Sequence, residues 1–277
     1  MVGKPLDLPF PVAAADFSPR GDFALAVSAS EGQTACVLRN LGGTNDSSSI
    51  DGAMSGADGV FLNADASVGI LLSSGSRTLQ VVRGLPDSPV AGPPLDLSSI
   101  SGTISAIAID HAGASVLIAV TADHGALYLA AAEQVRPSRI ADFGSPTALA
   151  LLEGDQDVIV ADAAVNELIL IRNFASAPQA FHLAGERDGV AGPAGLRISA
   201  DGRKLYIADR ASRTLDIWNF DAQSVEASYP LDAPPTRLTA LQGSSTFLLN
   251  DVGDHPLLLL DAINPAVYFV PAAKDQQ

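Results

Sequence analysis

Cysteine, lysine and tryptophan are scarce in this chain of 277 residues, which has one cysteine, three lysines and one tryptophan. The single cysteine, Cys36, excludes an internal disulfide, and without a CxxC pair it indicates no zinc site. Its apolar surroundings indicate a buried strand residue. Lys and Arg together number 16 against 31 Asp and Glu, a formal net charge of −15. Because nonspecific binding to phosphate backbones depends on basic residues, we expect no nucleic-acid partner.

Long apolar runs are also missing. No stretch of 18 apolar residues occurs, so we expect no membrane insertion. The first residues do not combine a basic region with an apolar one, as a signal peptide does. Since a signal can have been removed, a cytoplasmic and an extracytoplasmic (periplasmic or secreted) location both stay open, and the extracytoplasmic one is slightly favoured. With 47% hydrophobic and 17% charged residues, the chain has the composition of a folded protein.

Catalytic motifs are absent as well. The sequence has no GxSxG elbow, no P-loop, no HExxH and no GxGxxG. It therefore assigns no catalytic residue, no metal ligand and no cofactor, and an enzymatic role is not favoured.

The chain does contain an internal repeat of three short apolar runs separated by polar turns. Aligned copies of the third run begin at Ala35, Leu79, Leu127, Leu168, Leu215 and Leu257, in steps of 41 to 48 residues. The runs are four to seven residues long and are bounded by Gly, Asp, Asn, Ser and Pro, which is typical of strands. Runs such as Val158–Ala161 are apolar at consecutive positions, so both faces of the strand should be buried.

A four-stranded propeller blade takes about 40–45 residues, and stacked blades bury both faces of each sheet. A two-sheet sandwich would instead give alternating polar and apolar residues. The sequence thus predicts a single all-β domain, a six-bladed β-propeller of four-stranded antiparallel blades. The predicted blades span residues 10–51, 52–98, 99–142, 143–184, 185–231 and 232–271. Residues 4–8 could close the last blade, but Ala266–Val270 fits the same outer position, and the sequence does not decide between them.

One copy of the repeat is more specific. Ala184-Gly185, Asp188–Leu196, Asp201-Gly202 and Leu205–Asp209 resemble an NHL repeat, and residues 199–208 are similar to the related YVTN-type repeat. The resemblance implies a six-bladed propeller that binds protein or RNA or acts as a sensor. Related propellers are lyases and lactonases. The gluconolactonase-like propellers bind a divalent ion through oxygen ligands on the inner strands, and few such ligands occur on the inner strands expected here.

Recurrent acidic residues follow the second strand of several repeats, at Asp162, Asp209 and Asp251. They could form a ring of carboxylates that binds a cation. Recurrence at one repeat position favours a structural role, in which each carboxylate accepts hydrogen bonds from the following turn.

Two histidines, His124 and His255, share a context in Asp123-His124 and Asp254-His255. Both pairs fall in turns expected on the propeller face that gathers loops around the central channel. They are either exposed turn residues or candidate ligands of a metal at the channel entrance.

The longest connection into an inner strand, residues 184–193, contains Glu186 and Arg187, and the following turn contains Arg210 and Arg213. Propellers use the loop-rich face for ligands. We therefore expect a monomeric, non-enzymatic module that binds a protein, peptide or small polar ligand there. The alternative is a propeller hydrolase or lyase that uses a divalent cation. The candidate ligand-binding residues are Asp123, His124, Glu186, Arg187, Arg210, Arg213, Asp254 and His255.

Overall fold

A computed structural model describes residues 10–30, 34–41, 46–131, 136–242, 246–250, 257–261 and 266–270. The chain divides into two compact units, and each is described by itself. The first comprises residues 1–101, 109–116 and 130–138, and the second comprises residues 102–108, 117–129 and 139–277. In the described part of the chain the only helix is η1 (Glu186–Asp188), a 3₁₀ turn, and no helix is long and apolar enough to cross a membrane.

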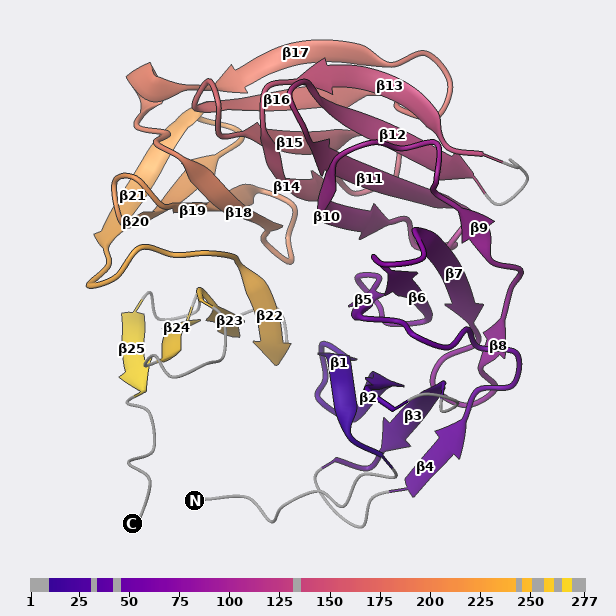
Figure 1. The fold of residues 1–277 in the computed structure, drawn as a ribbon. Coiled ribbons are helices and arrows are strands. Elements are labelled where there is room, and N and C mark those ends of the chain that lie inside the picture. Colours follow the sequence, from indigo (N-terminus) through magenta and orange to yellow (C-terminus); the bar gives the residue numbers. More distant parts are fainter. Residues whose placement is uncertain are drawn as a thin grey trace. The chain divides into compact units, whose positions relative to one another are not determined.

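Six antiparallel sheets, here blades 1 to 6, follow one another along the chain (Figure 1), and in all but blade 2 the strands pair in chain order. Blade 1 contains β1 (Val12–Phe17), β2 (Phe23–Ser28), β3 (Ala35–Arg39) and β4 (Asp46–Ser49). Blade 2 contains β5 (Gly59–Leu62), β6 (Val68–Ser73), β7 (Thr78–Arg83), β8 (Val90–Ala91) and β9 (Leu95–Asp96). Blade 3 contains β10 (Thr103–Ile109), β11 (Ser115–Thr121), β12 (Gly125–Ala131) and β13 (Ser138–Phe143).

The other three blades have the same order. Blade 4 contains β14 (Pro146–Leu151), β15 (Val158–Asp162), β16 (Glu167–Arg172) and β17 (Gln179–Ala184). Blade 5 contains β18 (Pro193–Ile198), β19 (Lys204–Asp209), β20 (Thr214–Asn219) and β21 (Ser224–Pro230). Blade 6 contains β22 (Thr239–Gln242), β23 (Thr246–Leu248), β24 (Leu257–Asp261) and β25 (Ala266–Val270). The predicted fold class, an all-β six-bladed propeller, is confirmed. The outer strand of blade 6 is β25, and residues 4–8 lie outside the described residues.

Blade 2 departs from the four-strand pattern, because two short strands, β8 and β9, share the outer position beside β7. Gly92-Pro93-Pro94 separates them. Proline has no backbone N–H, so Pro93 and Pro94 cannot donate to the ladder. The outer strand therefore ends at Ala91 and pairs again only at Leu95, opposite Leu79.

The second strands are the most buried. Every residue of β2, β6 and β15 is buried, whereas β1 and β21 alternate between more and less exposed positions. The prediction that Val158–Ala161 is covered on both faces is thus confirmed. Cys36, on β3, is buried too, as its apolar surroundings in the sequence predict. Burial raises the pKa of its thiol to about 11.

A recurrent turn joins the first strand to the second. In four blades its first side chain accepts a hydrogen bond from a backbone N–H at the start of the second strand. The pairs are Phe23 N to Ser18 Oγ, Val68 N to Asn63 Oδ1, Ala114 N to Asp110 Oδ1 and Lys204 N to Ser199 Oγ. The fourth turn residue has positive φ, between 60° and 70°, and is Gly in three of the four turns (Gly21, Ala66, Gly113 and Gly202). This geometry explains the Asp/Gly spacing of the repeat.

Within the second unit, adjacent blades are joined at their inner strands and through a shared core. Ser105 Oγ donates to the Pro146 carbonyl and Thr147 Oγ1 donates to the Pro193 carbonyl, each over 2.5 Å. Leu168 of blade 4 packs in one apolar cluster with Leu205 and Trp218 of blade 5. The loops that connect the strands of blades 4 and 5 are therefore attached to a well-packed core.

Candidate functional site

The candidate site is a group of loops, here called the blade 5 loop cluster, made of residues 185–192, residues 210–213 and Asn166. Residues 185–192 connect β17 to β18, and residues 210–213 turn from β19 into β20. Two main-chain hydrogen bonds join these segments, from Arg210 N to Gly192 O (2.9 Å) and from Ala211 N to Ala191 O (3.1 Å). The structure thus brings the predicted residues Glu186, Arg187, Arg210 and Arg213 into one connected group of loops.

Residues 185–192 have a defined structure. The Asp188 carboxylate accepts a hydrogen bond from Gly185 N over 2.9 Å, and Gly189 N donates to Glu186 O over 3.1 Å. Gly189 has φ of 100°, a conformation that a side chain would strain. Val190 is 1% exposed and packs in the core between blades 4 and 5. Its burial fixes the loop to the body of the second unit.

Asn166 holds the two ends of this loop. It lies in the turn between β15 and β16 with φ of 54°. Its Nδ2 donates to Glu186 Oε1 and its Oδ1 accepts from Gly192 N, both over 2.8 Å. Sequence analysis did not single out this residue. Its position two residues before the aligned Leu168 is the only signal in the sequence, and Asn is a common residue in left-handed turns.

The charges of the cluster are partnered unequally. Glu186 accepts from Asn166, Asp188 accepts from Gly185 N, and the neighbouring Glu167 lies 4.0 Å from His182 Nε2. Arg187, Arg210 and Arg213 are exposed, and no side-chain hydrogen bond or ion pair joins their guanidinium groups to any of the described residues. The carboxylates are therefore engaged by the protein itself, and the guanidinium groups remain available to a ligand.

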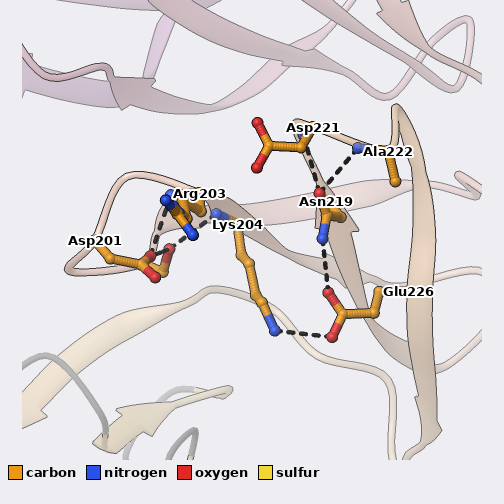
Figure 2. Close-up of polar contacts among 8 residues, drawn as sticks. Asp201, Arg203, Lys204, Asn219, Asp221, Ala222 and Glu226 are labelled. Atoms are coloured by element: carbon orange, nitrogen blue, oxygen red, sulfur yellow. Dashed lines mark hydrogen bonds and ion pairs between the residues drawn. The ribbon is translucent and has the colours of Figure 1, made fainter.

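The opposite end of blade 5 shows the contrary arrangement (Figure 2). Lys204 Nζ lies 2.8 Å from Glu226 Oε1, and Asn219 Nδ2 donates to Glu226 Oε2 over 3.0 Å. The hydrogen bond with Glu226 raises the pKa of Lys204, and the one with Lys204 lowers the pKa of Glu226. Asp221 N and Ala222 N donate to Asn219 Oδ1. The Lys204–Glu226–Asn219 group at this end is thus internally satisfied.

A buried acidic pair lies behind the 210–213 turn. Asp209 is fully buried, and neither of its carboxyl oxygens has a well-formed hydrogen bond in the described part of the chain. Burial and the neighbouring Asp216 carboxyl raise the pKa of Asp209 to about 8, against a small lowering by the Ala191 N–H. Asp216 is buried as well and accepts from Thr214 Oγ1 over 3.1 Å. Asp209 is therefore mainly uncharged at neutral pH.

The recurrent acidic residues turn out to have different roles. Asp162 accepts hydrogen bonds from Gly144 N and Ser145 N, each over 2.7 Å, and from Ala164 N. The predicted structural role is confirmed for Asp162, although two of its donors precede the first strand rather than follow the second. It is wrong for Asp209, whose carboxyl group accepts no well-formed hydrogen bond from the turn that follows it. Asp251 lies outside the described residues.

Of the other predicted site residues, the structure describes only Asp123 and His124. Asp123 and His124 are exposed in the turn between β11 and β12, and Asp254 and His255 lie outside the described residues. The described ranges contain no group of three or more His, Cys, Asp or Glu side chains that could hold a metal ion.

The first unit contains a hollow of about 260 Å³ beside the outer strands of blade 2. Its lining is mainly apolar, from residues such as Leu79, Val116 and Ala130, and its one charged side chain is Arg83. Arg83 Nη2 already donates to Gly113 O over 2.5 Å. The hollow is smaller than common ligand pockets and offers few polar groups, so the blade 5 loop cluster is the better candidate.

Comparison with solved structures supports the fold. A chain of hydrazine synthase from Kuenenia stuttgartiensis superposes with a TM-score of 0.59 at 12% identity, over 94% of this chain and 83% of that one. A chain of the nidogen–laminin complex superposes with a TM-score of 0.55 at 13% identity, over 77% of this chain and 78% of that one. No protein-family model and no curated protein matches this sequence. At such low identity the likeness shows the fold alone: the chain is similar to known β-propellers.

Proposed function

We propose that this chain is a non-enzymatic binding module, related to the NHL-type propellers, that recognises a protein, peptide or small polar ligand through the blade 5 loop cluster. The observation that carries the proposal is a hydrogen-bonded loop and turn that together present three exposed guanidinium groups, none of them engaged by a described residue. A preorganised loop loses little conformational entropy on binding. The NHL-like residues Ala184–Asp209 include the loop 185–192 and end directly before the 210–213 turn. The nidogen–laminin complex gives an instance of a similar fold in a protein complex.

Replacement of Asn166 tests the proposal, because this side chain fixes the loop without being part of the core. Asn166→Gly keeps the left-handed turn and removes both hydrogen bonds to Glu186 and Gly192. We expect ligands found with an unbiased peptide array and a metabolite thermal-shift screen to bind this variant about tenfold or more weakly, since the loop is no longer preorganised.

Asn173→Gly is the matched control. Asn173 also has positive φ, lies in blade 4 and occupies the turn at the opposite end of β16, where its side chain forms no hydrogen bond with the described residues. Equal binding by wild type and Asn166→Gly would contradict the proposed site. Stoichiometric zinc or calcium that survives dialysis, with turnover that depends on it, would replace the binding module by a metal-dependent enzyme.

A further inference from the structure

The ligand class of the blade 5 loop cluster follows from its three arginines, whose guanidinium groups have no side-chain partner among the described residues. Each guanidinium group offers five N–H donors and no acceptor. Arg187, Arg210 and Arg213 are exposed, and their guanidinium groups are free of side-chain partners in the described part of the chain. The neighbouring Glu186 and Asp188 are held by Asn166 and Gly185 N. Resting on the proposed function, we propose that these three arginines bind a carboxylate ligand, either a free di-carboxylic acid or the acidic side chains of a peptide.

Carboxylate geometry fits this donor set. The planar guanidinium fork pairs with a carboxylate through two parallel hydrogen bonds, and such charge-assisted bonds are stronger than neutral ones. Arg210 and Arg213 lie in a four-residue turn that is bonded to residues 191 and 192, so a ligand can contact the turn and the loop of Arg187 together.

The raised pKa of the buried Asp209 limits the negative charge next to the cluster. It immediately precedes Arg210 in the sequence, and an ionised carboxylate there would oppose anion binding. Because burial and Asp216 raise its pKa to about 8, Asp209 is mainly uncharged at neutral pH. Two carboxylates, Glu186 and Asp188, remain within the cluster against the three arginines.

A compact ligand is favoured over a polyanion. The chain carries a formal net charge of −15, and this long-range field repels a strand of many phosphates. A ligand with two to four carboxylates meets the arginines directly and carries less charge into that field. Tighter binding of single-stranded RNA than of an acidic peptide would overturn the assignment.

Calorimetric titration of the full chain tests the ligand class. The probes are a blocked tetraglutamate peptide, the matching tetraglutamine peptide and succinate. We expect the Glu peptide or succinate to bind at low salt, and the Gln peptide to bind at least tenfold more weakly. Succinate that binds as tightly as the peptide points to a free acid, whereas binding of the peptide alone points to a protein segment.

Arginine variants locate the site. Arg210→Gln or Arg213→Gln should weaken binding about tenfold each, and Lys at either position should restore only part of the affinity, because Lys lacks the planar fork. Arg203→Gln, an exposed arginine at the other end of blade 5, should leave binding unchanged. Equal binding of the Glu and Gln peptides overturns the carboxylate class.

The two proposals can fail separately. If a neutral or basic ligand loses affinity in the Asn166→Gly variant and no carboxylate probe binds, the binding module stands and the ligand class is wrong. If every ligand found is insensitive to Asn166→Gly and to the arginine variants, both proposals are wrong. Far-UV circular dichroism of each variant confirms that the strands are retained.

Discussion

Asp162 and Asp209 hold the same position at the ends of β15 and β19, yet their carboxyl groups have opposite surroundings. Asp162 accepts three backbone hydrogen bonds, and Asp209 faces the buried Asp216 without a well-formed hydrogen bond. The pKa of a free Asp carboxyl is near 4, and that of Asp209 in the fold is about 8. Between these pH values the unfolded chain releases this proton while the folded chain keeps it. The Asp209 contribution to the free energy of unfolding therefore decreases as pH rises from about 4 to about 8.

Asp209→Asn should remove this pH dependence. We expect its thermal midpoint to exceed that of wild type by about 2–4 °C or more at pH 8, and to approach that of wild type at pH 4. Asp162→Asn should lower the midpoint at pH 8, because an amide has one acceptor oxygen for three N–H groups. Asp221→Asn, at an exposed position, is the control. Thermal unfolding at both pH values measures the difference, and a lower midpoint for Asp209→Asn at pH 8 would contradict the role of Asp209.

At the scale of elements, blade 2 shows how a divided outer strand is held. Gln80, which is 2% exposed on β7, donates through Nε2 to Gly52 O (2.9 Å) and Gly92 O (2.7 Å). Its Oε1 accepts from Met54 N over 2.7 Å. One buried side chain thus connects β7 to the chain before β5 and to Gly92, the last residue before Pro93 and Pro94 interrupt the outer strand.

Gln80→Ala should destabilise the fold by about 1–3 kcal/mol, because it removes the buried side chain that partners three part-buried backbone groups, Gly52 O, Met54 N and Gly92 O. Gln179→Ala, at an exposed position of β17, should change the stability by less than about 0.5 kcal/mol. Urea unfolding with unchanged m-value measures both differences. Equal midpoints for Gln80→Ala and wild type would show that the outer strands do not depend on this side chain.

The strands were largely predictable from the sequence, because apolar runs of four to seven residues between turn residues are too short for helices. Val158–Ala161 was predicted to be covered on both faces and is buried at each position. The divided outer strand of blade 2 was not predicted, although Pro93 and Pro94 are its cause.

The site was predictable only in part. The charged residues at 186, 187, 210 and 213 can be read from the sequence. The hydrogen bonds of Asn166 and the Asp209–Asp216 pair cannot, because they depend on contacts between segments that an alignment of the repeats does not reveal.

For the whole molecule, the net charge of −15 predicts that the protein does not bind nucleic acid. We expect no shift of generic single-stranded RNA by micromolar protein at about 50 mM salt, where phosphate contacts are strongest. A gel-shift or filter-binding assay measures this, and the variant Arg210→Gln should behave like wild type. Micromolar binding that disappears in this variant would show that the blade 5 loop cluster reads phosphates.

The burial pattern explains how chains with very different sequences can form a similar propeller fold. Side chains of the second strands β2, β6 and β15 are buried, while alternate positions of β1 and β21 and the turns face solvent. Interior positions accept many apolar residues of similar volume, and exposed ones accept most polar residues. Few positions therefore demand one amino acid. This permits a similar fold over 77–94% of this chain with only 12–13% identical residues.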